Sequence, residues 1–143
     1  MTSTQSNKIQ ISKQWWSLFA LSLGTFLFSL DVHIVNLALP TLVEDLHTDL
    51  ATVEWVPLSY SLMLAVMVLS VARLGDMWSK KWLYIIGLAA FTSSSLVCGI
   101  ATTINILIGA RLFQGLGGVF IAVLAPAIAT EVFPNNKRGL ALG

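Results

Sequence analysis

The sequence predicts an all-α integral membrane protein with four transmembrane helices. Of its 143 residues, 56% are hydrophobic and only 10% are charged, whereas soluble domains carry about 25% charged residues. The mean hydropathy is +0.81. A helix needs about 20 mostly apolar residues to cross the hydrocarbon core. Four segments meet this requirement, and we place them at 15–39, 55–72, 82–101 and 104–130, after a polar cytoplasmic tail at 1–14.

The first span contains an acidic residue where lipid is expected. Asp31 interrupts the apolar segment that runs from Trp15 to Leu39. An ionised side chain at the centre of a membrane helix costs about 2.5–3.5 kcal/mol on insertion scales, so such residues usually face a bundle interior or a water-filled path. Asp31 is therefore a functional-site hypothesis. Helical spacing places mostly small residues on its face, namely Ser17, Ala20, Gly24, Leu27, Val35 and Ala38.

The second and third spans are joined by a segment, 72–81, that mixes an acid with three bases. Two interpretations stay open. In the first, the charges only orient the chain in the membrane. In the second, the carboxylate lies beside helix termini, favours one arrangement of the packed helices and makes the segment a gate. The gate hypothesis concerns Arg73, Gly75, Asp76, Lys80 and Lys81. Within the second span, Tyr60 is a candidate cavity residue only by its position after Trp55 and Pro57.

The fourth span carries one charge, Arg111, on a face of small residues. That face also holds Gln114, Gly115, Gly118, Ala122, Ala125, Pro126 and Ala129. Small residues let membrane helices approach closely, so packing alone explains such a strip when it has no charge. Asp31 and Arg111 lie at matching depth, on the order of 10–12 Å from the outer ends of their spans at about 1.5 Å per residue. If the two faces meet, the pair is either a static buried ion pair or a proton or substrate site.

Basic residues set the expected orientation, because short cytoplasmic loops are enriched in Lys and Arg. Seven of them fall on one side of the four spans: Lys8, Lys13, Arg73, Lys80, Lys81, Lys137 and Arg138. The segment between the first two spans contains no Lys or Arg and carries four acidic residues, Glu44, Asp45, Asp49 and Glu54. We therefore expect a multi-pass protein of the cell (inner) membrane, with the lipid bilayer as partner and both ends in the cytoplasm.

Several classes of function are disfavoured by the sequence. A formal net charge of +1, with no basic stripe, argues against nucleic-acid binding. Cys98 is the single cysteine, so no intrachain disulfide is possible, and we interpret it as a small packing residue. No nucleophile with a base partner, no metal-ligand spacing and no phosphate loop is present, since the glycines of 115–118 lie inside an apolar helix. We expect no enzyme activity, no metal and no cofactor.

Three segments together resemble the major facilitator superfamily, specifically its fourteen-helix drug:proton antiporters. Residues 30–40 (LDVHIVNLALP) are similar to the span-one signature, with His33 in place of the usual threonine. Residues 73–76 (RLGD) with Lys80 and Lys81 are similar to the loop between helices two and three, although Ala72 and Ser79 replace two glycines and Met77 replaces a basic residue. Residues 111–118 (RLFQGLGG) are similar to the span-four motif.

This resemblance implies the first four helices of an N-terminal six-helix half, built on inverted repeats of three helices. It implies proton coupling at Asp31 and Arg111, with the proton gradient as energy source. Spans one and four would line a central cavity for an amphiphilic small molecule, at Gly24, Gln114, Gly115 and Gly118, together with Tyr60. The further partners are the proton and the C-terminal helices of the same transporter.

The expected function is multidrug efflux by drug:proton antiport, with residues 1–143 as part of a transporter domain that is truncated and inactive alone. One alternative is a complete four-helix assembly or regulatory subunit without transport activity. Another is a small four-helix exporter that acts as a dimer, which explains Asp31 but explains neither Asp76 nor Arg111.

Overall fold

The computed structural model describes residues 3–133 and 139, with side chains described from residue 15 onward. Its elements are α1 (Ser3–Asp45), α2 (Leu50–Val53), α3 (Trp55–Met77), α4 (Lys80–Gly99) and α5 (Ile104–Val132). Four stretches are long and apolar enough to cross a membrane, at 15–45, 50–77, 80–99 and 104–132. The predicted all-α fold with four membrane-spanning helices is confirmed.

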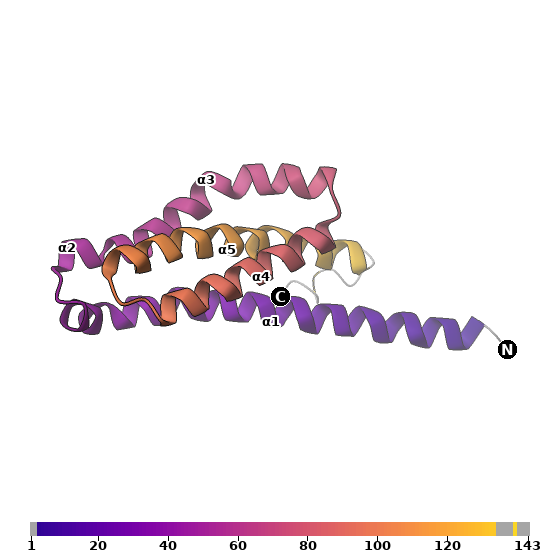
Figure 1. Ribbon diagram of the computed structural model, residues 1–143. Helices are drawn as coiled ribbons and strands as arrows, with labels where there is room; N and C mark the ends of the chain where they lie inside the picture. Colours follow the sequence, from indigo (N-terminus) through magenta and orange to yellow (C-terminus); the bar gives the residue numbers. More distant parts are fainter. Residues whose placement is uncertain (1–2, 134–138, 140–143) are drawn as a thin grey trace.

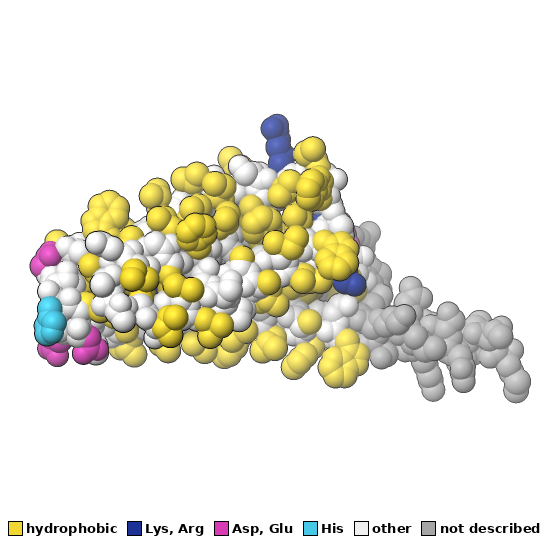
Figure 2. Space-filling view, viewed as in Figure 1, with side chains coloured by type: hydrophobic (Ala, Val, Ile, Leu, Met, Phe, Trp, Pro, Cys, Tyr) yellow, Lys and Arg dark blue, Asp and Glu magenta, His cyan; other side chains and the backbone are white. Residues whose placement is uncertain are grey.

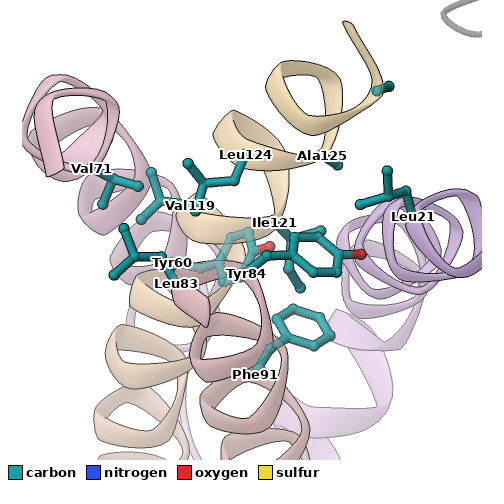
Figure 3. Close-up of a cluster of buried hydrophobic side chains, with 11 residues drawn as sticks. Leu21, Tyr60, Val71, Leu83, Tyr84, Phe91, Val119, Ile121, Leu124 and Ala125 are labelled. Atoms are coloured by element: carbon teal, nitrogen blue, oxygen red, sulfur yellow. The ribbon is translucent and has the colours of Figure 1, made fainter. Parts of the chain in front are cut away.

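Helix α5 is the central element of the bundle (Figure 1). It packs against α3, α4 and α1. Half of its most apolar stretch is buried inside the protein, whereas the buried share of the corresponding stretch in the other three spanning helices is 17–22%. The main core lies where these four helices meet (Figure 3). It includes Leu21 of α1, Tyr60 of α3, Tyr84 and Phe91 of α4, and Ile121 of α5. Most remaining apolar side chains face outward, as expected of a chain whose solvent is lipid.

Helices α4 and α5 are in backbone contact at a pair of glycines. A Cβ atom added to Gly117 would lie 2.5 Å from the backbone nitrogen of Phe91 and 2.8 Å from the carbonyl oxygen of Gly87. A Cβ atom on Gly87 would in turn collide with Phe120. Small residues therefore set the separation of these two helices, as is common in membrane bundles.

Helix α1 is longer than predicted at both ends. Residues 3–14 contain neither Gly nor Pro, so no residue interrupts the helix on the N-terminal side of the span. At the other end the helix continues through Pro40 to Asp45, since transmembrane helices tolerate proline. His47 then adopts φ 48° and Thr48 N–H donates to the Val43 carbonyl at 3.2 Å, which is a Schellman-type helix end.

A short helix, α2, leads into α3. Asp49 caps α2 by accepting hydrogen bonds from the Thr52 hydroxyl at 2.7 Å and the Thr52 N–H at 3.1 Å. These bonds hold the pKa of Asp49 below its ordinary value. Pro57 stands in the first turn of α3, where its missing N–H is tolerated.

The other helix ends also differ from the expected ones by a few residues. Helix α3 ends at Met77 instead of residue 72, and α4 spans Lys80–Gly99 instead of 82–101. The connection between them is therefore only Trp78 and Ser79. Hydropathy locates apolar residues, whereas a helix can continue with polar residues beyond the hydrocarbon core.

Basic side chains gather toward one end of the bundle (Figure 2). The end formed by the α1–α3 connection shows Asp, Glu and His side chains and carries no Lys or Arg, whereas Lys and Arg appear toward the other end, where Asp76 and Glu131 also lie. All five tryptophans are exposed, with exposed fractions of 52–71%. This distribution fits the positive-inside pattern and the interfacial preference of tryptophan. The side chains of Lys8 and Lys13, and residues 137 and 138, lie outside the described part.

We predict that Gly117→Ala destabilises the protein by about 1–3 kcal/mol, because the added methyl group meets backbone atoms that cannot move independently. The matched control is Gly109→Ala on the same helix, where an added Cβ has no neighbour within 4 Å, so its stability should equal or exceed that of the parent. Thermal unfolding of the purified proteins in detergent measures both. Equal stability of the two variants would contradict the contact between α4 and α5.

Candidate functional site

Asp31 of α1 and Arg111 of α5 form a buried ion pair. Arg111 Nη1 lies 2.8 Å from Asp31 Oδ2, and the two side chains are only 9% (Arg111) and 12% (Asp31) exposed. The charged faces that the sequence placed at matching depth therefore meet. Each charge offsets part of the desolvation penalty of the other.

Gln114 completes the surroundings of the carboxylate. It lies one turn after Arg111 on α5, is fully buried, and donates from Nε2 to Asp31 Oδ1 at 3.0 Å. Both oxygens of Asp31 thus accept a hydrogen bond from α5. In the described part of the chain, Arg111 Nε is buried without a hydrogen-bond partner.

Cys98 of α4 belongs to the same cluster, although the sequence suggested only a packing role. Its Sγ lies 3.6 Å from Gln114 Oε1, within reach of a thiol hydrogen bond. No motif or spacing in the sequence pointed to this contact. Only the close packing of α4 on α5 brings the thiol to the amide.

The small residues assigned to a substrate cavity lie at close helix contacts. A Cβ atom on Gly115 would lie 2.8 Å from the Tyr60 carbonyl oxygen, and one on Gly118 would lie 2.8 Å from the Tyr60 hydroxyl. Gly24 approaches the hydroxyl group of Tyr84. Tyr60 is only 4% exposed. These residues bring α3 and α4 to their neighbours, and a role in a cavity of a larger assembly stays a prediction.

Several cavities border α1 in the described part of the chain. One of about 540 Å³ runs between α1 and α5 and is lined by Ser22, Thr25, Ser29, Ala122 and Pro126, among others. A smaller one of about 100 Å³ is bordered by Arg111, Asn36 and Ser61. The ion pair therefore lies close to open space on the side of Arg111.

The segment proposed as a gate, 72–81, is mostly helical and not a connection between two helices as expected. Arg73, Gly75 and Asp76 belong to the last turns of α3, and Lys80 and Lys81 open α4. The helix continues because Gly75 is buried against Leu124 of α5, so this end of α3 is part of the packed bundle. Arg73 and Lys81 are exposed.

A residue missed by the sequence analysis, Glu131 of α5, connects this end of the bundle. Lys80 Nζ lies 2.5 Å from Glu131 Oε1 and 3.9 Å from Asp76 Oδ1. A single lysine thus joins the ends of α3, α4 and α5. The sequence of the connecting segment could not identify Glu131 as the partner of Lys80, because the two residues are 51 positions apart.

Comparison with known proteins agrees with this architecture. A sequence model described as "Major Facilitator Superfamily" matches residues 21–143. The chain is 41% identical over 129 residues to an uncharacterized MFS-type transporter of Mycobacterium tuberculosis, covering 90% of this chain and 22% of that protein. It is 37% identical to the drug efflux pump JefA (87% and 25% covered) and 39% identical to the multidrug resistance protein Stp (87% and 23%), both of the same species. The chain thus spans about a quarter of the length of these relatives.

We predict an asymmetry between the two ways of breaking the ion pair. Asp31→Leu leaves a buried guanidinium that cannot lose its proton, and it should cost about 3–5 kcal/mol. Arg111→Leu should cost less, because the carboxyl can take up a proton, and this cost should shrink further at low pH. The double variant should be more stable than Asp31→Leu.

Chemical unfolding of the purified variants at two pH values measures these differences. Additive effects in the double variant would mean that the two side chains do not interact.

Proposed function

The chain belongs to the major facilitator superfamily, and from this premise we propose that it forms part of a proton-coupled exporter of amphiphilic drugs. The observation that carries the proposal is the buried ion pair of Asp31 and Arg111. Relatives named as a drug efflux pump and a multidrug resistance protein support the direction and the class of substrate.

Asp31 is the proton-binding group in this proposal. An antiporter must bind proton and drug at alternate times. A carboxyl group in an apolar surrounding can be neutral when protonated and ionised when a cation approaches, which provides that exclusion. Arg111 and Gln114 each donate a hydrogen bond to Asp31, so a proton must compete with two hydrogen bonds. The proton gradient supplies the energy, and no cofactor takes part.

The remaining assignments follow from the same proposal. Gly24, Gln114, Gly115, Gly118 and Tyr60 contribute to the substrate cavity together with helices outside this chain, and the 143 residues alone do not transport. The cluster of Asp76, Lys80 and Glu131 acts as a gate at the cytoplasmic end, with Arg73, Gly75 and Lys81 beside it. The protein lies in the cell membrane with its first residues and Val132 on the cytoplasmic side.

We predict that Asp31→Asn abolishes proton release when a lipophilic cation such as tetraphenylphosphonium is added to the protein expressed from its own gene and purified in detergent. The asparagine side chain cannot exchange a proton, whereas it preserves the size of the site. Asp45→Asn is the matched control, since Asp45 is an exposed carboxylate on the same helix and its loss should leave proton release unchanged. Undiminished proton release from Asp31→Asn would place the proton carrier elsewhere.

The orientation is tested by single cysteines in a Cys98→Ser background. Glu44→Cys should react with a membrane-impermeant maleimide in intact cells, and Lys81→Cys should react only after the membrane is opened. Both positions are exposed, so access to the reagent depends on the side of the membrane. Labelling of Lys81→Cys from outside would reverse the topology.

A further inference from the structure

Asp31, Gln114 and Cys98, from three different helices, form a continuous hydrogen-bond chain. Gln114 Nε2 donates to Asp31 Oδ1 at 3.0 Å, and Cys98 Sγ lies 3.6 Å from Gln114 Oε1. Gln114 is fully buried and Cys98 is half-buried. The chain therefore links α1 through α5 to α4 in an apolar surrounding, where each such bond is stronger than in water.

The ionised state of Asp31 dictates one orientation of the Gln114 amide. A carboxylate only accepts hydrogen bonds, so the NH₂ end of the amide must face Asp31. The carbonyl end then faces α4 and requires a donor, since an unsatisfied buried carbonyl is costly. The Cys98 thiol supplies that donor.

The protonated state favours the opposite orientation. A proton on Asp31 Oδ1 creates an O–H donor, and Arg111 has no acceptor to offer it. Gln114 can accept this O–H if its amide turns over and presents Oε1 to Asp31. Its NH₂ group then faces Cys98, where the sulfur is a weak acceptor. A thiol can both donate and accept, so it offers the Gln114 amide a partner in each protonation state of Asp31.

We propose that Gln114 and Cys98 are positioning residues for Asp31, with the Gln114 amide turning over when Asp31 gains a proton and the Cys98 thiol satisfying both orientations. This inference rests on the proposed function, in which Asp31 exchanges a proton. It adds a route by which the protonation state of Asp31 on α1 is transmitted to α4. The bound proton stays on Asp31, and the O–H bond of Asp31 is the only covalent bond that forms or breaks.

Infrared difference spectroscopy on the protein expressed from its own gene tests the proposal directly. The S–H stretching band that disappears in Cys98→Ser belongs to Cys98, and the carboxyl C=O band that disappears in Asp31→Asn belongs to Asp31. On acidification the Asp31 band should appear and the Cys98 band should shift, with one common midpoint. In Asp31→Asn the Cys98 band should no longer respond to pH.

The outcomes separate this inference from the proposed function. An Asp31 band that appears while the Cys98 band stays unchanged overturns the relay and leaves the proposed function intact. Absence of any Asp31 carboxyl band over the pH range overturns both.

Substitutions give a second, independent measurement through the midpoint of proton release. Gln114→Leu should raise the midpoint by about one pH unit, a tenfold gain in proton affinity, because the charge-assisted hydrogen bond lost by the ionised carboxylate is stronger than the neutral one lost by the protonated carboxyl group. Cys98→Val should raise the midpoint by a few tenths of a pH unit, whereas Cys98→Ser should keep the midpoint of the parent protein. Thr92→Val is the control on α4, since the Thr92 hydroxyl donates to the Leu88 carbonyl of its own helix. Identical midpoints for Cys98→Val and Cys98→Ser would contradict the role of the thiol.

Discussion

The burial of one carboxylate constrains the arrangement of the whole bundle. Asp31 can reside inside a membrane span only where donors offset its lost hydration, and both donors come from α5. Helix α5 must therefore lie against α1 at this depth. Gly115 and Gly117 of the same helix then let α3 and α4 approach α5 closely.

The sequence predicted much of the fold because lipid imposes a simple rule. Every backbone polar group in the hydrocarbon must be satisfied internally, so a long apolar segment is a helix. The meeting of Asp31 with Arg111 was also predictable, because two isolated charges at one depth have few other partners. Helix ends were less predictable. The continuation of α1 past Pro40 and of α3 to Met77 depends on tertiary contacts and caps that hydropathy does not report.

The contacts of Cys98 and Glu131 could not be predicted from sequence for a different reason. Each is a single polar residue whose partner is chosen by the register of two packed helices. That register is set by the contact between Gly87 and Gly117, which permits backbone approach at one position. A shift of one turn would carry either side chain about 5.4 Å from its partner, beyond any hydrogen bond.

The distance in sequence between Asp31 and Arg111 has a consequence for biogenesis. The two residues are 80 positions apart, and at about 5–20 residues per second a ribosome takes roughly 4–16 s to synthesise that interval. During this time α1 has no access to its guanidinium partner. Its apolar residues, each favouring insertion by about 0.3–0.6 kcal/mol, must outweigh the single acid. The nascent helix can thus enter the bilayer first, and α5 joins it later as the counter-ion arrives.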